Sequence, residues 1–373
     1  MDPIELSKKI GGKIEIFSKE KLTLETLPVL YTPGVADVSR AIAKDKSLSF
    51  EYTIRKNCIA VVSDGSAVLG LGNIGPEAAL PVMEGKALLF KELGDVDAIP
   101  IVLNTQDTEE IITTVKNIAS TFGGINLEDI SAPRCFEIEE RLKKELDIPV
   151  FHDDQHGTAI VVLAGLINAL KVAEKKPEDI KVAISGAGAA GISIAKLLTL
   201  HGIKNLILCD RSGSIYRGRE EWTNPAKKEI AEITNPENIQ GSIWEVIEGA
   251  DVFIGISAPD ILKSEDIRKM KEKAIVFAMS NPVPEIMPEE AKKGGAYIVA
   301  TGRSDYPNQI NNVLAFPGIF RGALDTRTKM ITDEHKLKAA LAIANLVESP
   351  TPEMIIPAAL DPRVVSVVAK VFE

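Results

Sequence analysis

Apolar runs and segments with helical spacing alternate along the whole chain, and this alternation predicts an α/β protein. Short apolar runs typical of strands fall, in the first half, at residues 58–72 (two strands around an Asp64-Gly65 turn), 98–104, 125–131 and 148–154. Segments with helical spacing lie between them, at residues 80–93, 108–121 and 136–146. The fold class that follows is α/β, with helices packed on sheets.

The second half opens with the pattern of a βαβ unit, in which a strand-like run at 180–185, a glycine turn and a small-residue helix precede a second run at 205–210. The turn GAGAAG consists of Gly186, Ala187, Gly188, Ala189, Ala190 and Gly191. Such glycines let a pyrophosphate approach a helix N-terminus, and the acid that ends the next strand, Asp210, accepts from ribose hydroxyls. Asp210 favours NAD, but Arg211 and Ser212 could hold a 2′-phosphate, so NAD and NADP both stay open.

The same glycine spacing occurs in GLGNIG, residues 70–75, in a different context. Pro76 and Pro81 are expected to interrupt any helix after it. The candidate acid, Asp97, begins the following strand instead of ending it. We therefore interpret this copy as a tight loop near the substrate.

Residues 158–176 are apolar on nearly every face, which predicts a helix buried in the core. A chain of 373 residues has the length of about two domains. We place the junction beside the buried helix, with an N-terminal α/β domain over residues 1–155 and a C-terminal Rossmann-type, doubly wound nucleotide-binding domain over residues 156–373.

Two pairs of carboxylates lie at corresponding strand ends. Glu128 and Asp129 follow GGINL, and Asp153 and Asp154 follow IPVF. If these strands are neighbours in a parallel sheet, both pairs meet at the carboxyl edge, where α/β sheets bind ligands. Several oxygens at one place suit Mg²⁺ or Mn²⁺, although each carboxylate alone is more typical of a turn or a helix N-cap. The two pairs together predict a metal site.

The histidines beside the second pair raise zinc as an alternative. His152 and His156 have H-x-x-x-H spacing, which binds zinc when both lie on one helical face and a glutamate follows the first. Here Pro149 precedes an extended run, Asp153 follows the first histidine, and Gly157 follows the second. We therefore expect a strand end entering a loop, and zinc is the less favoured metal.

Lys86 and Tyr31 are candidates for proton transfer. The residues at helical spacing around Lys86 are apolar, so its charged form could be disfavoured and the amine could act as a base; a lysine whose head reaches water fits equally well. Tyr31 precedes Thr32 and Pro33, which are expected to begin a helix, and it could donate a proton there, although a half-buried tyrosine is the commoner case. Because it lies so near the N-terminus, Tyr31 could serve a partner's site in a homodimer or larger homo-oligomer.

Composition and charge restrict the partners. The formal net charge is −10 and no Lys/Arg block stands out, so we expect no nucleic acid partner. The N-terminal sequence has no apolar stretch of signal-peptide length, and no segment approaches the ~18 apolar residues of a membrane span. The three cysteines, without metal spacing, indicate reduced thiols. We expect a cytoplasmic protein that does not bind membranes.

Several segments together resemble the short prokaryotic form of malic enzyme: YTPGVA, EGKALLFK, GGINLEDI, PVFHDDQHGTA, the glycine turn, SNPVPE and GRSDYPNQINNVLAFPGIFRGAL. The resemblance runs from about residue 30 to residue 324 in the right order. It implies oxidative decarboxylation of L-malate to pyruvate and CO₂ with NAD or NADP and a divalent metal, Mg²⁺ or Mn²⁺. Larger relatives carry a phosphotransacetylase-like domain after this region, and we expect none here, because the chain ends too early.

The resemblance also implies roles for metal ligands, proton-transfer groups and asparagines near the substrate and nicotinamide. The matching residues are Glu128, Asp129 and Asp154 as metal ligands with Asp153 behind them, Lys86 as the base, Tyr31 as the acid, and Asn281 and Asn312 as the asparagines. Whether Asn311 or Asn312 makes the contact stays open. Where larger eukaryotic forms carry an arginine for a malate carboxylate, this chain has Ala67, so Arg55, Lys56 or Arg134 would have to supply that charge.

Three other functions fit parts of the sequence. A two-domain dehydrogenase of the amino-acid dehydrogenase type also places a lysine opposite a glycine turn, but needs no carboxylate cluster. A metal-dependent hydrolase with a vestigial nucleotide fold would act without nicotinamide. A non-catalytic NAD(P)-binding sensor would work without Lys86.

Overall fold

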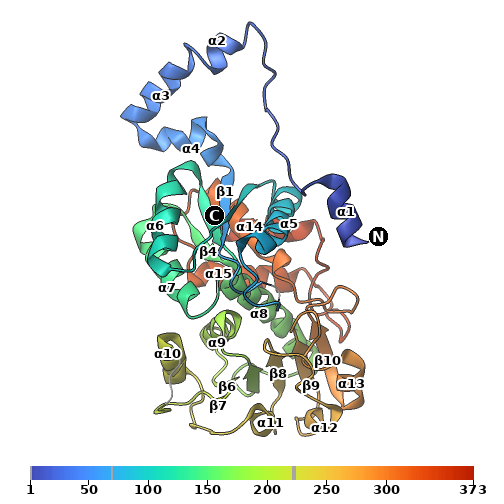
Figure 1. The fold of residues 1–373 in the computed structure, drawn as a ribbon. Coiled ribbons are helices and arrows are strands. Elements are labelled where there is room, and N and C mark those ends of the chain that lie inside the picture. Colours follow the sequence, from blue (N-terminus) through green and yellow to red (C-terminus); the bar gives the residue numbers. More distant parts are fainter. Residues whose placement is uncertain (1, 69, 221–223) are drawn as a thin grey trace.

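The computed structural model describes residues 2–68, 70–220 and 224–373, which form two sheets with helices around them (Figure 1). The smaller sheet has the strand order β2-β1-β3-β4. Its strands are β1 Cys58–Ser63, β2 Asp97–Val102, β3 Gly124–Leu127 and β4 Val150–His152. The helices between them are α5 Pro76–Gly94, α6 Thr108–Ile118 and α7 Arg134–Glu145. All its pairings are parallel, so the carboxyl ends of its strands share one edge.

The larger sheet has the order β10-β9-β8-β5-β6-β7 and is parallel except for β7. Its strands are β5 Lys181–Ser185, β6 Asn205–Asp210, β7 Gly213–Ser214, β8 Val252–Gly255, β9 Ala274–Ala278 and β10 Ala296–Thr301. The helices in this region are α9 Ala189–Leu200, α10 Pro225–Ile233, α11 Ile243–Val246, α12 Ser264–Ile267 and α13 Pro288–Lys293. Short 3-10 helices lie at η1 Lys46–Leu48, η2 Ile54–Lys56, η3 Ala119–Thr121, η4 Asn312–Leu314 and η5 Lys370–Phe372. The α/β fold class predicted from the sequence is confirmed.

Helix α8, Asp153–Ala173, lies between the two sheets, and its side chains join an apolar cluster with residues of both (Figure 1). It is the one described helix that is long and apolar enough to cross a membrane, but 78% of that apolar window is buried inside the structure. The predicted buried helix is therefore confirmed as a core helix, but the expectation that no segment approaches the length of a membrane span was wrong for this helix by length and composition. The domain junction that we place at residues 155 and 156 falls in its first turn and stays a prediction.

The last helices return to the smaller sheet. They are α14 Phe316–Asp325, α15 Asp333–Asn345 and α16 Arg363–Ala369. Helix α14 packs against α5, and α15 packs against α8. The core around α8 is thus built from both halves of the chain.

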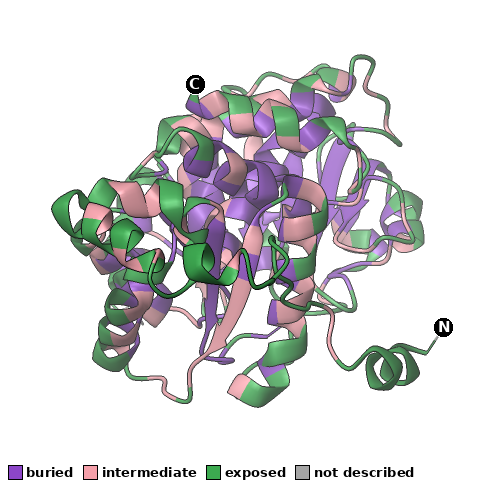
Figure 2. Ribbon diagram, turned by 90° about the horizontal axis from the view of Figure 1, so that it is seen from above, coloured by how far each residue is buried: buried purple, intermediate pink, exposed green. Residues whose placement is uncertain are grey.

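The N-terminal arm, residues 2–56, carries α1 Pro3–Ile10, α2 Leu27–Leu30, α3 Val35–Lys44 and α4 Ser49–Tyr52 (Figure 1). Its middle part, with α2 and α3, extends away from this core, whereas its two ends contact the core through Lys13, which donates to Glu84, and Arg55, which donates to the carbonyl of Phe122. None of the arm's residues is buried, and Figure 2 shows the N-terminal helix as exposed beside a buried interior. Many of its exposed side chains are apolar, including Ile16 and Leu24, each 90% exposed. An apolar surface of this extent is typical of a segment that packs on a partner.

Three local expectations were wrong. The described residues after Asp64 form only an isolated bridge between Val68 and Gly72, and no second strand is found among them. Pro76 and Pro81 do not interrupt a helix: α5 begins at Pro76, where the missing N–H costs nothing, and Pro81 gives up one hydrogen bond inside it. Residues 153–157 form the first turn of α8 and no loop.

Candidate active site

The carboxyl edge of the smaller sheet brings together the acidic residues expected there. Because β3 and β4 pair in parallel, the two acidic pairs leave the sheet side by side. One oxygen from each of Glu128, Asp129 and Asp154 lies within 4.8 Å of the others, as oxygens around a shared cation would. This group includes no histidine, although all histidines lie in the described part of the chain. The predicted meeting of the two strand ends is confirmed, and metal ligation stays a prediction.

The three carboxylates disfavour one another's charge. Burial, helped by Asp154 and Glu128, raises the pKa of Asp129 to about 9. Burial also raises the pKa of Asp154 to about 6. It raises the pKa of Glu128 as well, although the charge of Lys86 opposes this shift. The pKa of Asp154 rises less because the charge of Lys86 opposes the effect of burial and because Asp154 Oδ2 accepts from Asp129 N at 2.8 Å. A divalent cation at this place would relieve the repulsion.

Lys86 extends from α5 into the same acidic group. Its Nζ donates to Asp153 Oδ2 at 2.6 Å, lies 2.9 Å from Glu128 Oε1, and lies 4.2 Å from the centre of the Phe316 ring. Burial alone would lower the pKa of Lys86, but Asp153 and Glu128 outweigh burial and raise it above its ordinary value. Both alternatives drawn from the sequence, a disfavoured charge and a solvated head, were therefore wrong: the side chain is 8% exposed and its charge is balanced.

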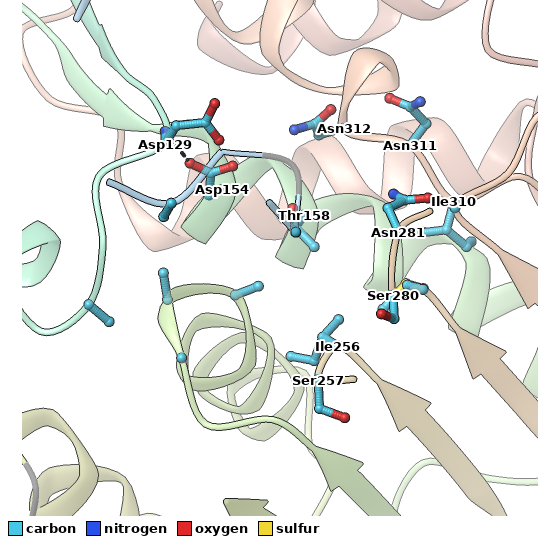
Figure 3. Close-up of a pocket in the computed structure, with 18 of the residues that line it drawn as sticks. Asp129, Asp154, Thr158, Ile256, Ser257, Ser280, Asn281, Ile310, Asn311 and Asn312 are labelled. Atoms are coloured by element: carbon cyan, nitrogen blue, oxygen red, sulfur yellow. Dashed lines mark hydrogen bonds between the residues drawn. The ribbon is translucent and has the colours of Figure 1, made fainter. Parts of the chain in front are cut away.

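A cavity of about 540 Å³ opens from this cluster toward the larger sheet. Asp129 and Asp154 lie on one side of it, joined by their hydrogen bond, and Ile256 and Ser257 lie on the other (Figure 3). Gly70 also lines the cavity, in keeping with a loop near the substrate. The cavity thus connects the acidic edge of one sheet to the strand ends of the other.

The asparagines expected near the substrate lie along the same cavity (Figure 3). Asn312 donates from Nδ2 to Asp153 Oδ2 at 2.6 Å. Asn311 instead accepts the backbone N–H of Val313 at 3.0 Å and so begins the short helix η4. Asn281 lines the cavity after β9. The structure therefore ties Asn312, and not Asn311, to the acidic group.

The glycine turn between β5 and α9 has two packing glycines and one open glycine. A Cβ on Gly186 would lie 2.5 Å from the carbonyl oxygen of Ile256, and one on Gly191 would lie 1.9 Å from the carbonyl oxygen of Gly186. A Cβ on Gly188 would meet nothing within 4 Å. Gly188 lines the cavity and caps α9 without a side-chain hydrogen bond, so the first N–H groups of this helix are available to a phosphate.

Asp210 ends β6 as predicted, but its carboxylate already has two cationic partners. Arg219 donates to Oδ1 at 2.9 Å, and Lys227 donates to Oδ2 at 2.6 Å. These partners lower the pKa of Asp210 although burial opposes them. Arg211 is exposed, and the backbone N–H of Ser212 donates to Asp210. Sequence reasoning missed Arg219 and Lys227, since nothing local to Asp210 indicates residues that return to it through the fold.

Tyr31 is separated from the acidic group within one chain. It ends α2 on the N-terminal arm, is 67% exposed, and is not among the described residues that line the cavity. The expected helix start at Thr32 and Pro33 was wrong, because α3 begins at Val35 after a turn. A single chain therefore does not bring Tyr31 to Lys86.

Of the three cations considered as replacements for an arginine at position 67, one lies at the carboxyl edge. Arg134 donates to Asp64 Oδ2 at 2.8 Å and to Ser66 Oγ at 3.1 Å, and Ser66 directly precedes Ala67, which lines the cavity. Arg55 donates to a carbonyl just before β3, and Lys56 lines a second cavity at the opposite edge of the sheet. Among the described lining residues of the main cavity there is no lysine or arginine.

Sequence reasoning also missed Glu139, a buried carboxylate behind the cluster. It is 4% exposed, and its Oε1 accepts the backbone N–H of His152 at 3.0 Å. A signal was present: helical spacing places Glu139 on the same face as Cys135, Ile138 and Leu142, all of which are buried. An acid on the apolar face of a helix indicates a charge with a structural or functional partner.

Comparison with known proteins gave consistent matches over nearly the whole chain. Two family models match: "Malic enzyme, N-terminal domain" over residues 11–143 and "Malic enzyme, NAD binding domain" over residues 155–371. The NAD-dependent malic enzyme of Geobacillus stearothermophilus is 64% identical over 339 residues, which cover 91% of this chain and 70% of the relative. The bifunctional malic/malolactic enzyme of Bacillus subtilis is 55% identical over 372 residues, 99% of this chain and 91% of the relative. The crystal structure of the NAD-dependent malic enzyme from Thermotoga maritima is similar with a TM-score of 0.97 and 54% identity, covering 100% of this chain and 99% of that one.

Proposed function

The chain belongs to the malic enzyme family, and from this membership we propose that it oxidises L-malate with NAD⁺ or NADP⁺ and releases CO₂ to give pyruvate, with Mg²⁺ or Mn²⁺ bound. The observation that carries the proposal is the carboxylate cluster beside Lys86, of which Asp129 and Asp154 line a cavity that also reaches the glycine turn. A plain amino-acid dehydrogenase needs no such cluster, and a hydrolase needs no glycine turn.

The residues at the cluster fit a hard divalent cation. Glu128, Asp129 and Asp154 offer oxygens only, which favours Mg²⁺ or Mn²⁺ over zinc. The Oδ2 atom of Asp129 is buried and has no hydrogen-bond partner among the described residues, as a vacant ligand atom would be. A bound cation supplies a Lewis acid that polarises the substrate's oxygen and stabilises the charge left by CO₂.

Lys86 and Asp153 form a hydrogen-bonded pair. Lys86 must be neutral to accept the proton of the substrate's 2-hydroxyl group. Asp153 lies 2.6 Å away and, together with Glu128, holds Lys86 in its protonated form; a divalent cation bound to the carboxylate cluster would oppose this effect and favour the neutral amine. Asn312 donates to the same oxygen of Asp153 and fixes its orientation. We assign Lys86 as the base and Asp153 as its hydrogen-bond partner.

Tyr31 is assigned as the acid that protonates C3 of the enol form of pyruvate, in the active site of a second copy. Within one chain it is 67% exposed on an arm that has no buried residue. The exposed apolar side chains along that arm would be covered by a partner subunit. A homodimer in which each arm reaches the other chain's cavity accounts for both observations.

Mixing two inactive variants tests this assignment. Tyr31→Phe and Lys86→Ala protomers, refolded or exchanged together at equal amounts, would form hybrids with one intact site, so we expect about a quarter of wild-type activity. Each variant mixed with itself serves as the control. Activity that stays at the level of the separate variants would mean that both residues act within one chain, or that Tyr31 is not the acid.

The pairing at Asp210 supports the use of either cofactor. Two cations, Arg219 and Lys227, hold the carboxylate, so the site has one positive charge in excess of the acid. The carboxylate accepts from ribose hydroxyls in NAD, and the extra cation suits the 2′-phosphate of NADP. We therefore expect measurable turnover with both.

We also propose that the protein works in the cytoplasm. Cys58, Cys135 and Cys209 are all free and buried, which suits a reducing compartment. Cell fractionation followed by immunoblotting tests this, and recovery in an oxidising compartment would contradict it.

The proposed reaction is tested by following absorbance of reduced nicotinamide with L-malate and either NAD⁺ or NADP⁺, first with Mn²⁺ and then with chelator, while pyruvate is assayed in parallel. We expect metal-dependent reduction with equimolar pyruvate. Reduction that yields oxaloacetate without pyruvate would instead identify a simple dehydrogenase. No reduction under any of these conditions would leave only a binding function.

A further inference from the structure

Helix α8 starts against a buried carboxylate of the preceding helix. Glu139 of α7 accepts the backbone N–H of His152 on Oε1 at 3.0 Å, and its Oε2 lies 2.8 Å from His156 Nε2. Lys143, one turn further along α7, pairs with Oε1 at 2.6 Å. Glu139 is therefore held by three partners on three different segments: the end of β4, the first turn of α8, and α7 itself.

The two contacts of Glu139 on the α8 side lie just before and just after Asp153 and Asp154 in the sequence. His152 is the last residue before Asp153 and Asp154, and His156 follows two residues after them. His152 caps α8 without a side-chain hydrogen bond, and neither of its ring nitrogens has a partner among the described residues. The restraint at the start of α8 is thus supplied by Glu139 through the backbone of His152 and the ring of His156.

A ligand set depends on this restraint, because donor atoms must be held to within about half an ångström of their productive positions. Asp154 reaches Asp129 through one hydrogen bond of 2.8 Å, which a small rotation of the first turn would break. The turn itself is tightly packed, since a Cβ on Gly157 would lie 1.8 Å from Asp153 Oδ1. A shift at His152 or His156 would therefore move the acidic residues between them.

The charge of Glu139 is maintained although it is buried. His156 and Lys143 hold the pKa of Glu139 well below its ordinary value against the effect of burial. Removing one partner of such a buried pair leaves an uncompensated group and is strongly destabilising. Glu139 also lies outside the substrate cavity, in the wall of a separate one between α7, α8, α9 and α10, so it cannot touch the reacting atoms there.

We propose that Glu139 is a positioning residue for the metal site: by holding His152 and His156 it sets the start of α8, and with it the placement of Asp154 toward Glu128 and Asp129. This rests on the proposed function for the presence of a metal at that cluster. It goes beyond that function because it states that Glu139, a residue of α7 without any contact to metal, substrate or cofactor, determines how tightly the metal binds.

The test uses Glu139→Gln and Glu139→Ala in the full-length protein, with Glu140→Gln as a matched control. Glu140 is the next residue on α7, but it is exposed, and its one ion pair among the described residues is with Lys144. We expect Glu139→Ala to weaken Mn²⁺ binding, measured by titration calorimetry, by about 10–100-fold, as loss of an outer support typically does. Glu139→Gln should fall between Glu139→Ala and wild type, and cofactor affinity should stay within about twofold in all three variants.

This split between metal and cofactor affinity separates positioning from a general loss of structure, which would weaken both. If Glu139→Ala does not fold, Glu139→Gln alone decides. Wild-type Mn²⁺ affinity in a folded Glu139 variant, or equal losses for Mn²⁺ and cofactor, would overturn the proposal. Absence of Mn²⁺ binding by the wild-type protein would instead overturn the proposed function, so the two failures are distinguishable.

Discussion

Replacing Asp154 by asparagine should have opposite effects on metal binding and on the metal-free fold. Asparagine keeps the shape of the side chain and an oxygen that can accept from Asp129 N, a hydrogen bond of 2.8 Å in the structure. It removes one of three carboxylate charges whose ligand atoms lie within 4.8 Å of one another. The substitution therefore removes an anionic ligand from the metal and a like charge from its neighbours.

The size of each effect follows from the geometry. Loss of a direct ligand should weaken Mn²⁺ binding at least about tenfold, or about 1.4 kcal/mol. The ligand atoms lie within 4.8 Å of one another, and two full charges at that distance repel by about 3.5 kcal/mol at an effective dielectric constant near 20. Solvent reaches Asp154, which is 33% exposed, and Asp129 keeps its proton below a pKa of about 9, so we expect a net gain of about 1–2 kcal/mol for the metal-free fold.

The gain should grow with pH. Because the folded-state pKa of Asp129 is raised from 3.8 to about 9, the stability that its proton contributes is complete at low pH and is lost as the pH rises toward 9. Without the charge of Asp154, the pKa of Asp129 falls and this loss becomes smaller. The variant should therefore gain more over wild type at pH 9 than at pH 6.

The assays are Mn²⁺ titration calorimetry at neutral pH, and urea unfolding in chelator at pH 6, 7.5 and 9. Asp147→Asn is the control, because Asp147 is 89% exposed and its one ion pair within the described part of the chain is with Lys329 at 3.4 Å. An Asp154→Asn protein that binds Mn²⁺ like wild type would refute its role as a ligand. A metal-free variant less stable than wild type at pH 9 would refute the argument from charge repulsion.

Three further substitutions test the proton-transfer and cofactor assignments. Lys86→Ala should lower turnover at least about 100-fold with cofactor affinity unchanged by calorimetry, and substantial remaining turnover would exclude Lys86 as the base. Lys227→Gln should raise KM for NADP⁺ at least about tenfold more than KM for NAD⁺, because only the 2′-phosphate loses a charged partner; equal changes would contradict that contact. Gly188→Ala should weaken cofactor binding and leave the melting temperature unchanged. Gly191→Ala should lower the melting temperature, because its Cβ would lie 1.9 Å from a carbonyl oxygen. The opposite result would contradict the assignment of Gly188 to the cofactor and of Gly191 to packing.

The features that could be predicted from the sequence are those set by neighbours along the chain. Strand-like runs and their ends predicted where Glu128 and Asp154 would emerge, and the parallel pairing of β3 and β4 confirmed that they meet. Local rules failed where packing decided between two conformations. Gly157 suggested a loop, but it lies in the first turn of α8, where a larger residue would collide with Asp153.

Helical spacing predicted that Lys86 lies on a buried face, but it did not predict which groups Lys86 contacts there. Those groups, Asp153 and Glu128, decide whether the pKa of Lys86 is raised or lowered. Its nearest carboxylate, Asp153, is 67 residues away from Lys86 in the sequence, and the second donor to that carboxylate, Asn312, is 159 residues away from Asp153. Only the packing of α5, α8 and η4 brings the three residues together. The same reasoning extends to Tyr31, because its exposure of 67% within one chain leaves its partner on another copy. The surroundings of Lys86 depend on the rest of its own fold, and those of Tyr31 depend on a second subunit. The mixing of inactive protomers therefore tests whether the active site is formed by two chains.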